Sequence, residues 1–295
     1  MARAEIPVDL LNPGQVFACL GLMEASEAVS QRPCEGSFIY QDGGTDARFR
    51  LQVDGDDDPV TSVLSFLSKS RVTSIAPEGA DLSTTKWGVP TTAGVQTYPA
   101  PAPDTPASLA IVLESDGRAI PVEHWLDGPH NGRDNVKFWA GSGGYPGAAL
   151  ARDALAIVAA LGANAIAEAA FDPFNFAAPM TSSFRFDMRR DYVPLDAGFS
   201  LNSHDAMTTV GYPLVELLAA IGLQNARPLR PERRNKLVYR YAVTDAALST
   251  TLVRAVLGCG ELGFPLRTFT MRLDWPGQEG QARCIVEARE EEKAQ

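Results

Sequence analysis

The 295-residue sequence contains little of what builds a disulfide scaffold, a zinc centre or a histidine-based active site. It has four cysteines and three histidines, and no two cysteines form a CxxC pair. This spacing excludes a zinc ribbon and a disulfide framework, and it predicts reduced, partly buried thiols. No histidine stands in an HExxH or GxSxG context, so we expect no metal ion and no catalytic residue.

Long apolar runs and an excess of positive charge are also missing. The N-terminus has no apolar signal core, and the most apolar later stretch, 148–170, carries Arg152, Asp153 and Glu168. We therefore expect a cytoplasmic protein that makes no membrane contact. The net charge of −10 argues against a protein that coats DNA, so any nucleic-acid role must rest on a local basic patch.

The first eighty residues alternate between strand and helix patterns in the order β-α-β-β-α-β. Asn12 and Pro13 are suited to the start of the first helix, as N-cap and first helical residue. The order predicts an α+β fold with an N-terminal ferredoxin-like unit, which RNA-recognition modules share with many enzymes. The expected elements are a strand at 6–10, a helix over 13–24, strands at 37–41 and 48–53, a helix over 60–67 and a strand at 72–75.

Hairpins and helices are expected to elaborate this unit. We predict a ferredoxin-like start over 1–87, a Pro-rich loop over 88–108, the remainder of the same or a second α+β unit over 109–287, and a charged tail over 288–295. The later patterns predict strands at 109–113 and 120–124, a helix over 147–170 interrupted near Gly162, a strand at 184–186, a helix over 213–223, a strand at 237–243, a helix over 246–257, and strands at 268–273 and 282–287.

A glycine-rich turn at 141–147 is the strongest enzyme signal, because backbone amides at a helix start can bind phosphate. Its spacing differs from both common nucleotide motifs. Pro146 stands where a dinucleotide fingerprint has glycine, and Gly147 is followed by two alanines where a P-loop has Lys and Ser or Thr. We expect no cofactor, and a nucleotide-dependent enzyme that uses this turn is an alternative. A metal at His130, with Asp127 and Asp134, is the weaker interpretation of a turn-rich loop.

Cations and aromatic rings surround the glycine turn. Cations bind phosphates and aromatic faces stack on bases, so these side chains are candidates for nucleic-acid binding. The alternative is that the rings belong to the core and the cations are solvated. Two further candidate arginines alternate with acids near residue 190. Paired acids can do acid–base work, but such neighbours more simply form salt bridges or order a polar loop. The candidates are Arg133, Lys137, Trp139, Tyr145, Arg152, Arg189 and Arg190.

The window 227–240 has six basic residues and one acidic residue in a chain that is acidic overall. Such a local positive surface can bind a polyanion, while the remaining surface discourages nonspecific association. The alternative is a solvated loop between a helix and a strand. The candidate phosphate contacts in this window are Arg230, Arg233, Arg234 and Lys236.

Five uncommon strings resemble a CRISPR-associated protein of the type I-U (renamed I-G) systems, a small member of the effector-complex large-subunit group. They span nearly the whole chain, and no established pattern of functional residues is transferred with them. The strings are IPVDLLNPGQVFACLGLMEA at 6–25, GRDNVKFWAGSGGYPGAALARDAL at 132–155, SSFRFDMRRDYVPLDAGFSLN at 182–202, GYPLVELLAAIGLQNARP at 211–228 and WPGQEGQARC at 275–284.

The resemblance implies a non-catalytic subunit of a crRNA-guided surveillance complex, of the Cascade type, that acts in antiviral defence. Its implied partners are crRNA and target DNA, the other effector subunits, and the helicase-nuclease that such a subunit recruits. In these complexes base pairing reads the sequence, and protein reads shape and a short adjacent motif. The chain is short for a large subunit, so a backbone subunit that holds crRNA, or a purely structural partner-binding protein, are the other interpretations.

Overall fold

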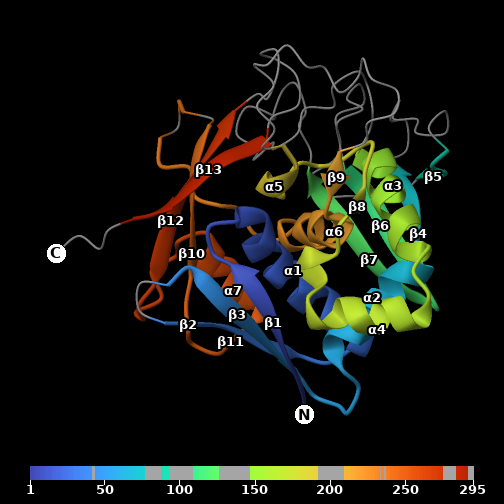
Figure 1. Cartoon of the computed structure of the whole chain (residues 1–295), viewed down its shortest axis with the longest axis horizontal. Helices are drawn as coiled ribbons and strands as arrows, with labels where there is room; N and C mark the ends of the chain where they lie inside the picture. The colour runs from blue at the N-terminus through green and yellow to red at the C-terminus, as the bar shows by residue number, and fades with distance from the viewer. Residues whose placement is uncertain are drawn as a thin grey trace.

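A computed structural model of the chain describes residues 1–41, 44–76, 88–93, 109–125, 147–191, 209–232, 234–235, 237–274 and 284–291. These residues form an α+β fold, as the sequence predicts. Antiparallel pairing dominates its sheets, and the helices lie between and beside them (Figure 1).

The first sheet contains the three strands expected near the N-terminus and a short fourth strand from the C-terminal half. Its order is β1 (Ala2–Asp9), β3 (Asp46–Val53), β2 (Cys34–Tyr40) and β11 (Leu248–Ser249), with antiparallel neighbours. Alternate residues of β3, such as Phe49 and Leu51, are buried, whereas Arg48 is exposed. This period of two fixes which face of the sheet meets the helices.

The β-α-β-β-α-β order is confirmed, but the fourth strand leaves the sheet that a complete ferredoxin-like unit would form. β4 (Arg71–Ala76) pairs instead with β5 (Thr91–Ala93), in parallel, and with β6 (Leu109–Ser115), in antiparallel fashion. With β7 (Arg118–Trp125) they form a second sheet in the order β5-β4-β6-β7. The hairpin of β6 and β7 supplies β4 with a neighbour, while later parts of the chain contact β1.

The C-terminal half adds two smaller sheets. β10 (Val238–Val243), β12 (Arg267–Asp274) and β13 (Cys284–Glu290) form an antiparallel sheet in that order. β8 (Ala178–Pro179) and β9 (Val210–Gly211) form a short antiparallel pair.

Two helices occupy the middle of the molecule (Figure 1). α1 (Pro13–Ser30) packs against α6 (Pro213–Gly222), which is buried along its whole length. Most of α1 is buried as well. The buried surface of the helix is wider than the single apolar stripe that its sequence suggests. The reason is that α6, α2, α7 and the sheets contact α1 from several directions.

Glycine makes the close approach of these helices possible. A Cβ atom added to Gly21 would lie 1.7 Å from the Leu218 carbonyl oxygen, and one added to Gly222 would lie 2.3 Å from that of Phe17. No side chain fits at those distances, so the spacing of α1 and α6 depends on both glycines.

The remaining helices cover the sheets. α2 (Pro59–Lys69) is capped by Asp58, whose carboxylate accepts a 2.7 Å hydrogen bond from the Thr61 amide. The predicted interruption near Gly162 is confirmed, because α3 (Gly147–Ala159) and α4 (Ala163–Phe171) meet at a bend of 107°. The others are η4 (Pro173–Asn175), the single turn α5 (Met188–Asp191) and α7 (Thr250–Leu257).

Some element predictions are wrong in identity or extent. The segment 184–186 is not a strand, because the amides of Phe186 and Asp187 donate to the Glu216 side chain instead of to another strand. The helix expected from 246 begins at Thr250, since Leu248 and Ser249 pair with β2. Part of the expected Pro-rich loop forms β5, and β13 continues to Glu290, into the expected tail.

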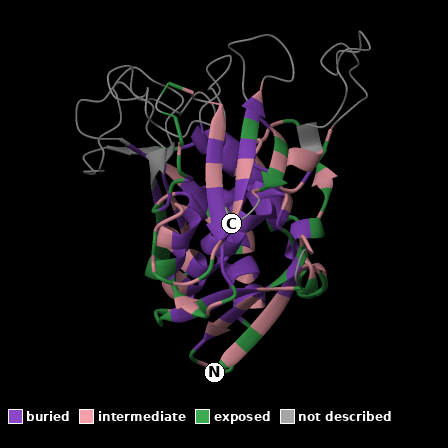
Figure 2. Ribbon diagram, turned by 90° about the vertical axis from the view of Figure 1, so that its left-hand side faces the viewer, coloured by how far each residue is buried: buried purple, intermediate pink, exposed green. Residues whose placement is uncertain are grey.

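The buried apolar side chains form one continuous cluster that extends from Ile6 to Ile285. Figure 2 shows the buried residues, in purple, in the interior of the molecule and the exposed residues, in green, toward the outside. An edge-to-face contact of Phe17 with Tyr241, and a stack of Tyr241 on Phe269, connect α1 to the C-terminal sheet. Within the described ranges, no single helix is long and apolar enough to span a membrane.

We predict that Gly21→Ala lowers the free energy of unfolding by about 1–3 kcal/mol or more, because the methyl group forces α1 away from α6. Gly162→Ala is the matched control, since its Cβ would meet no atom within 4 Å. We expect the control to change stability by less than about 1 kcal/mol. Urea unfolding measures both variants, and a Gly21→Ala protein as stable as the wild type would contradict the close packing.

Candidate functional site

A buried polar cluster lies where three distant parts of the chain meet, near the first turns of α1 and α6. We define it as Asn12, Asp187, Arg189, Tyr212 and Glu216. The Asn12 amide nitrogen donates to Asp187 Oδ1 at 3.0 Å, and Glu216 Oε1 accepts from the Asp187 backbone amide at 3.0 Å. Asp187 and Glu216 are both completely buried. The cluster therefore ties residues 184–189 to both central helices.

Asn12 is the residue before α1, as predicted, but it does not cap the helix with its side chain. Its side chain donates to Asp187, and Asn12 Oδ1 has no hydrogen-bond partner in the described structure. Gln15 is turned back toward β1, where its Oε1 accepts from the Asp9 amide at 2.8 Å. The start of α1 is thus fixed by contacts to other segments.

Arg189, a predicted nucleic-acid contact, is held inside the buried polar cluster. Its Nε donates to Asp187 Oδ1 at 2.9 Å, and its Nη2 donates to Asp187 Oδ2 and to the Phe174 carbonyl, both at 2.6 Å. Its guanidinium carbon also lies 3.4 Å from the centre of the Tyr212 ring, a cation–π contact. These contacts give Arg189 a structural role.

Arg152, another predicted contact, is also paired within the protein. Its Nε donates to Asp153 Oδ1 at 2.9 Å, and Asp153 Oδ2 accepts from the Ser182 hydroxyl at 2.6 Å. The hydrogen bond between Asp153 and Ser182 thereby joins α3 to the segment that leads to Asp187 in the buried polar cluster.

The basic segment, residues 227–240, ends within β10, the edge strand of the C-terminal sheet. Leu229 and Arg240 exchange two backbone hydrogen bonds of 2.8 and 2.7 Å, so Leu229 lies beside β10. Arg227 and Arg234 are exposed, and Arg230 is half-buried. The Arg240 guanidinium forms an ion pair with Glu291. Arg227 and Arg234 of the predicted basic window are therefore at the surface, whereas the charge of Arg240 is paired within the protein.

Several predicted contacts lie outside the described residues. These are Arg133, Lys137, Trp139, Tyr145, Arg233 and Lys236, the side chain of Arg190, and the turn residues 141–146. Gly147, the last residue of that turn, begins α3 and is buried. The nucleic-acid and nucleotide hypotheses for these residues stay predictions.

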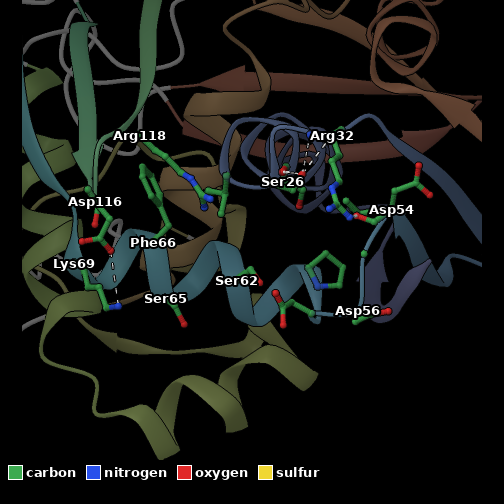
Figure 3. A pocket seen from close by; sticks show the side chains of 17 residues that line it. Ser26, Arg32, Asp54, Asp56, Ser62, Ser65, Phe66, Lys69, Asp116 and Arg118 are labelled. Carbon is green, nitrogen blue, oxygen red and sulfur yellow. Dashed lines mark hydrogen bonds and ion pairs between the residues drawn. The ribbon is translucent and has the colours of Figure 1, made fainter.

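A polar groove that the sequence analysis missed lies between the end of α1, the β3–α2 turn, α2 and the β6–β7 turn (Figure 3). Its volume is ≈590 Å³, within the usual range of ligand-binding clefts. Five serines contribute to its lining: Ser26, Ser30, Ser62, Ser65 and Ser115.

Charges of opposite sign mark the two ends of the groove. Asp54, Asp56 and Asp57 stand on the β3–α2 turn at one end, and Arg32 donates to the Asp54 carbonyl oxygen there at 2.8 Å. Lys69 and Arg118 stand at the other end, where Lys69 lies 3.9 Å from Asp116 (Figure 3). The acidic run Asp54–Asp58 was the sequence signal for this site, but alone it only indicates a turn.

Three arginines on the outer face of the first sheet were also missed. Arg3, Arg48 and Arg50 surround Glu5, with Arg50 Nε 2.9 Å from Glu5 Oε1. Hydrogen bonds from Arg3 and Arg50 lower the pKa of Glu5 from its ordinary value. Because one carboxylate engages all three cations, this cluster stabilises cross-strand pairing.

The four cysteines are free thiols, of which Cys19, Cys34 and Cys284 are buried. Burial raises the pKa of Cys34 to about 12 and that of Cys259 to about 11. Both thiols are therefore protonated near neutral pH and are poor nucleophiles. Within the described residues, no group of three or more His, Cys, Asp and Glu side chains is arranged to hold a metal ion.

Comparisons of the chain with protein-family models, with curated proteins and with solved structures find no match.

We predict that Arg189→Ala destabilises the protein by about 3 kcal/mol, because it leaves the buried Asp187 carboxylate without its cation. The double variant Arg189→Ala/Asp187→Asn should recover part of this loss, since the uncompensated charge is gone and the amide oxygen still accepts from Asn12. Chemical denaturation of the two variants measures the difference. An equal loss in both would show that Arg189 does not offset the charge of Asp187.

Proposed function

We propose that the chain is a non-catalytic, nucleic-acid-binding subunit of a crRNA-guided CRISPR surveillance complex in antiviral defence. In this role it contributes to binding crRNA and target DNA, and to recognition of the adjacent motif or recruitment of the helicase-nuclease. The other effector subunits are its protein partners.

The observation that carries this proposal is where the resembling strings meet. Strings 6–25, 182–202 and 211–228 supply all five residues of the buried polar cluster and both glycines of the helix contact. String 132–155 joins them through Asp153 and Ser182. The resembling strings therefore contain the residues that hold the two central helices together, which is where a likeness in fold would be expressed.

The basic segment supports the nucleic-acid part of the proposal. Arg227 and Arg234 are exposed on a segment beside a sheet edge, in a chain with a net charge of −10. Phosphate contacts position a nucleic acid without reading its sequence, as expected of a subunit that leaves sequence recognition to the guide. Arg152 and Arg189 carry this proposal less than the basic segment does, because carboxylates of the protein already engage both guanidinium groups.

A backbone subunit that holds crRNA is the second candidate, and the N-terminal sheet favours it. The β1-β3-β2 order, with α1 connecting β1 to β2, is the part of a ferredoxin-like unit that RNA-recognition modules share. Both candidates require the chain to contact nucleic acid.

We predict that Arg227→Ala/Arg234→Ala weakens binding to single-stranded RNA of any sequence. Loss of two phosphate contacts should reduce the slope of log affinity against log salt by about 1.4. Fluorescence anisotropy with the full chain measures this slope, and Lys69→Ala/Arg71→Ala is a control of equal charge change. An unchanged slope would remove the basic segment from the interface, and a wild-type chain that binds neither RNA nor DNA would contradict the proposed function.

A further inference from the structure

The polar groove continues into a second hollow, and the two form one elongated trough. The second hollow has a volume of ≈660 Å³ and shares Lys69, Ser115, Asp116 and Arg118 with the first. It extends past the β6–β7 turn to Arg71 and Glu114. A compact small molecule fills one hollow, whereas an extended peptide can occupy both.

Some charges that line the trough pair within the protein, as Lys69 does with Asp116 and Arg71 with Glu114, and others do not. Among the described residues, the carboxylates of Asp56 and Asp57 and the guanidinium of Arg118 have no hydrogen-bond or ion-pair partner, and all three residues are exposed. The arginines around Glu5 differ in this respect, because Glu5 engages them. Unpaired charges of both signs along one trough favour a ligand with complementary charges.

A buried hydroxyl in the lining is also without a partner. Ser26 is 3% exposed, and its Oγ makes no hydrogen bond within the described structure. A buried polar atom normally has a partner, so Ser26 offers a hydrogen bond to a group that enters the trough. It lies in α1 near Ser30 and Arg32, at the acidic end of the trough (Figure 3).

The charge pattern excludes nucleic acid as the occupant of the whole trough. Asp54, Asp56 and Asp57 would repel a phosphate backbone at one end. They would attract a lysine or arginine side chain, while Lys69 and Arg118 would attract a carboxylate. A polypeptide carries both kinds of charge on one chain, and its backbone can also accept or donate at the serine hydroxyls.

We propose that the trough binds an extended segment of another protein subunit, with a basic side chain at the Asp54–Asp57 end and a carboxylate at the Lys69–Arg118 end. This inference rests on the proposed function, because the complex supplies the partner. It assigns subunit docking to this face and leaves nucleic-acid binding to the basic segment.

Carbodiimide cross-linking tests the proposal, because the reagent joins a carboxylate to a nearby amine as an amide and takes up the water released. In the isolated full chain we expect a link between Lys69 and Asp116, whose side chains lie 3.9 Å apart. In the complex purified from cells that also express the neighbouring genes, this link should decrease. Links from Asp56 or Asp57, or from Lys69, to one segment of another subunit should replace it.

Charge reversal provides a second measurement that does not depend on a lysine in the partner. Asp56→Lys/Asp57→Lys should reduce incorporation of the chain into the complex by about tenfold or more, since like charges then face each other. Glu168→Lys/Glu261→Lys is the matched control, because both glutamates are exposed and lie outside the trough. Thermal unfolding of both variants verifies that they fold.

The outcomes separate this inference from the proposed function. If the complex forms, but no trough residue links to another subunit and the reversed variant incorporates like the control, the inference is wrong and the proposed function stands. If the chain joins no complex, both are wrong. Trough links together with selective loss of the Asp56→Lys/Asp57→Lys variant would support the docking segment.

Discussion

The close contact between α1 and α6 is the constraint on which the rest of the structure depends. Gly21 and Gly222 let the helix backbones approach, and the buried polar cluster fixes their first turns against residues 184–189. The sheets are arranged around this pair, with Tyr241 donating a 2.7 Å hydrogen bond to the Leu10 carbonyl from the C-terminal sheet. Segments as far as 231 residues apart in sequence, as Leu10 and Tyr241 are, thus depend on one another.

This arrangement separates the residues that hold the fold from those available to partners. Arg152, Arg189, Arg240 and Arg267 are all arginines whose charge is engaged by a carboxylate within the chain. Arg227 and Arg234 are exposed in the basic segment, and none of the residues that line the trough comes from that segment. A subunit that binds nucleic acid and protein at once needs such separate surfaces, because an acidic docking site beside a phosphate contact would weaken it.

The sequence predicts elements better than it predicts what their side chains contact. Periodicity identified α1, α2, α6 and the break at Gly162, because local apolar spacing determines helices. It could not predict that β4 joins a second sheet, since strand pairing depends on distant neighbours. Charge counting selected both the basic segment and Arg189. It could not show that the buried Asp187 carboxylate engages Arg189, because that contact is a tertiary feature. The trough combines four separate elements, so the acidic run at 54–58 could not reveal it alone.

The central claim is that the chain works as a nucleic-acid-binding subunit of a guide-RNA complex. The most direct test is to purify the tagged full chain from cells that express the neighbouring genes and to sequence the RNA that elutes with it. The account predicts discrete RNAs of uniform length, each a spacer flanked by repeat sequence, together with the other effector subunits. A chain that elutes alone, or with RNA fragments that follow cellular abundance, would contradict it.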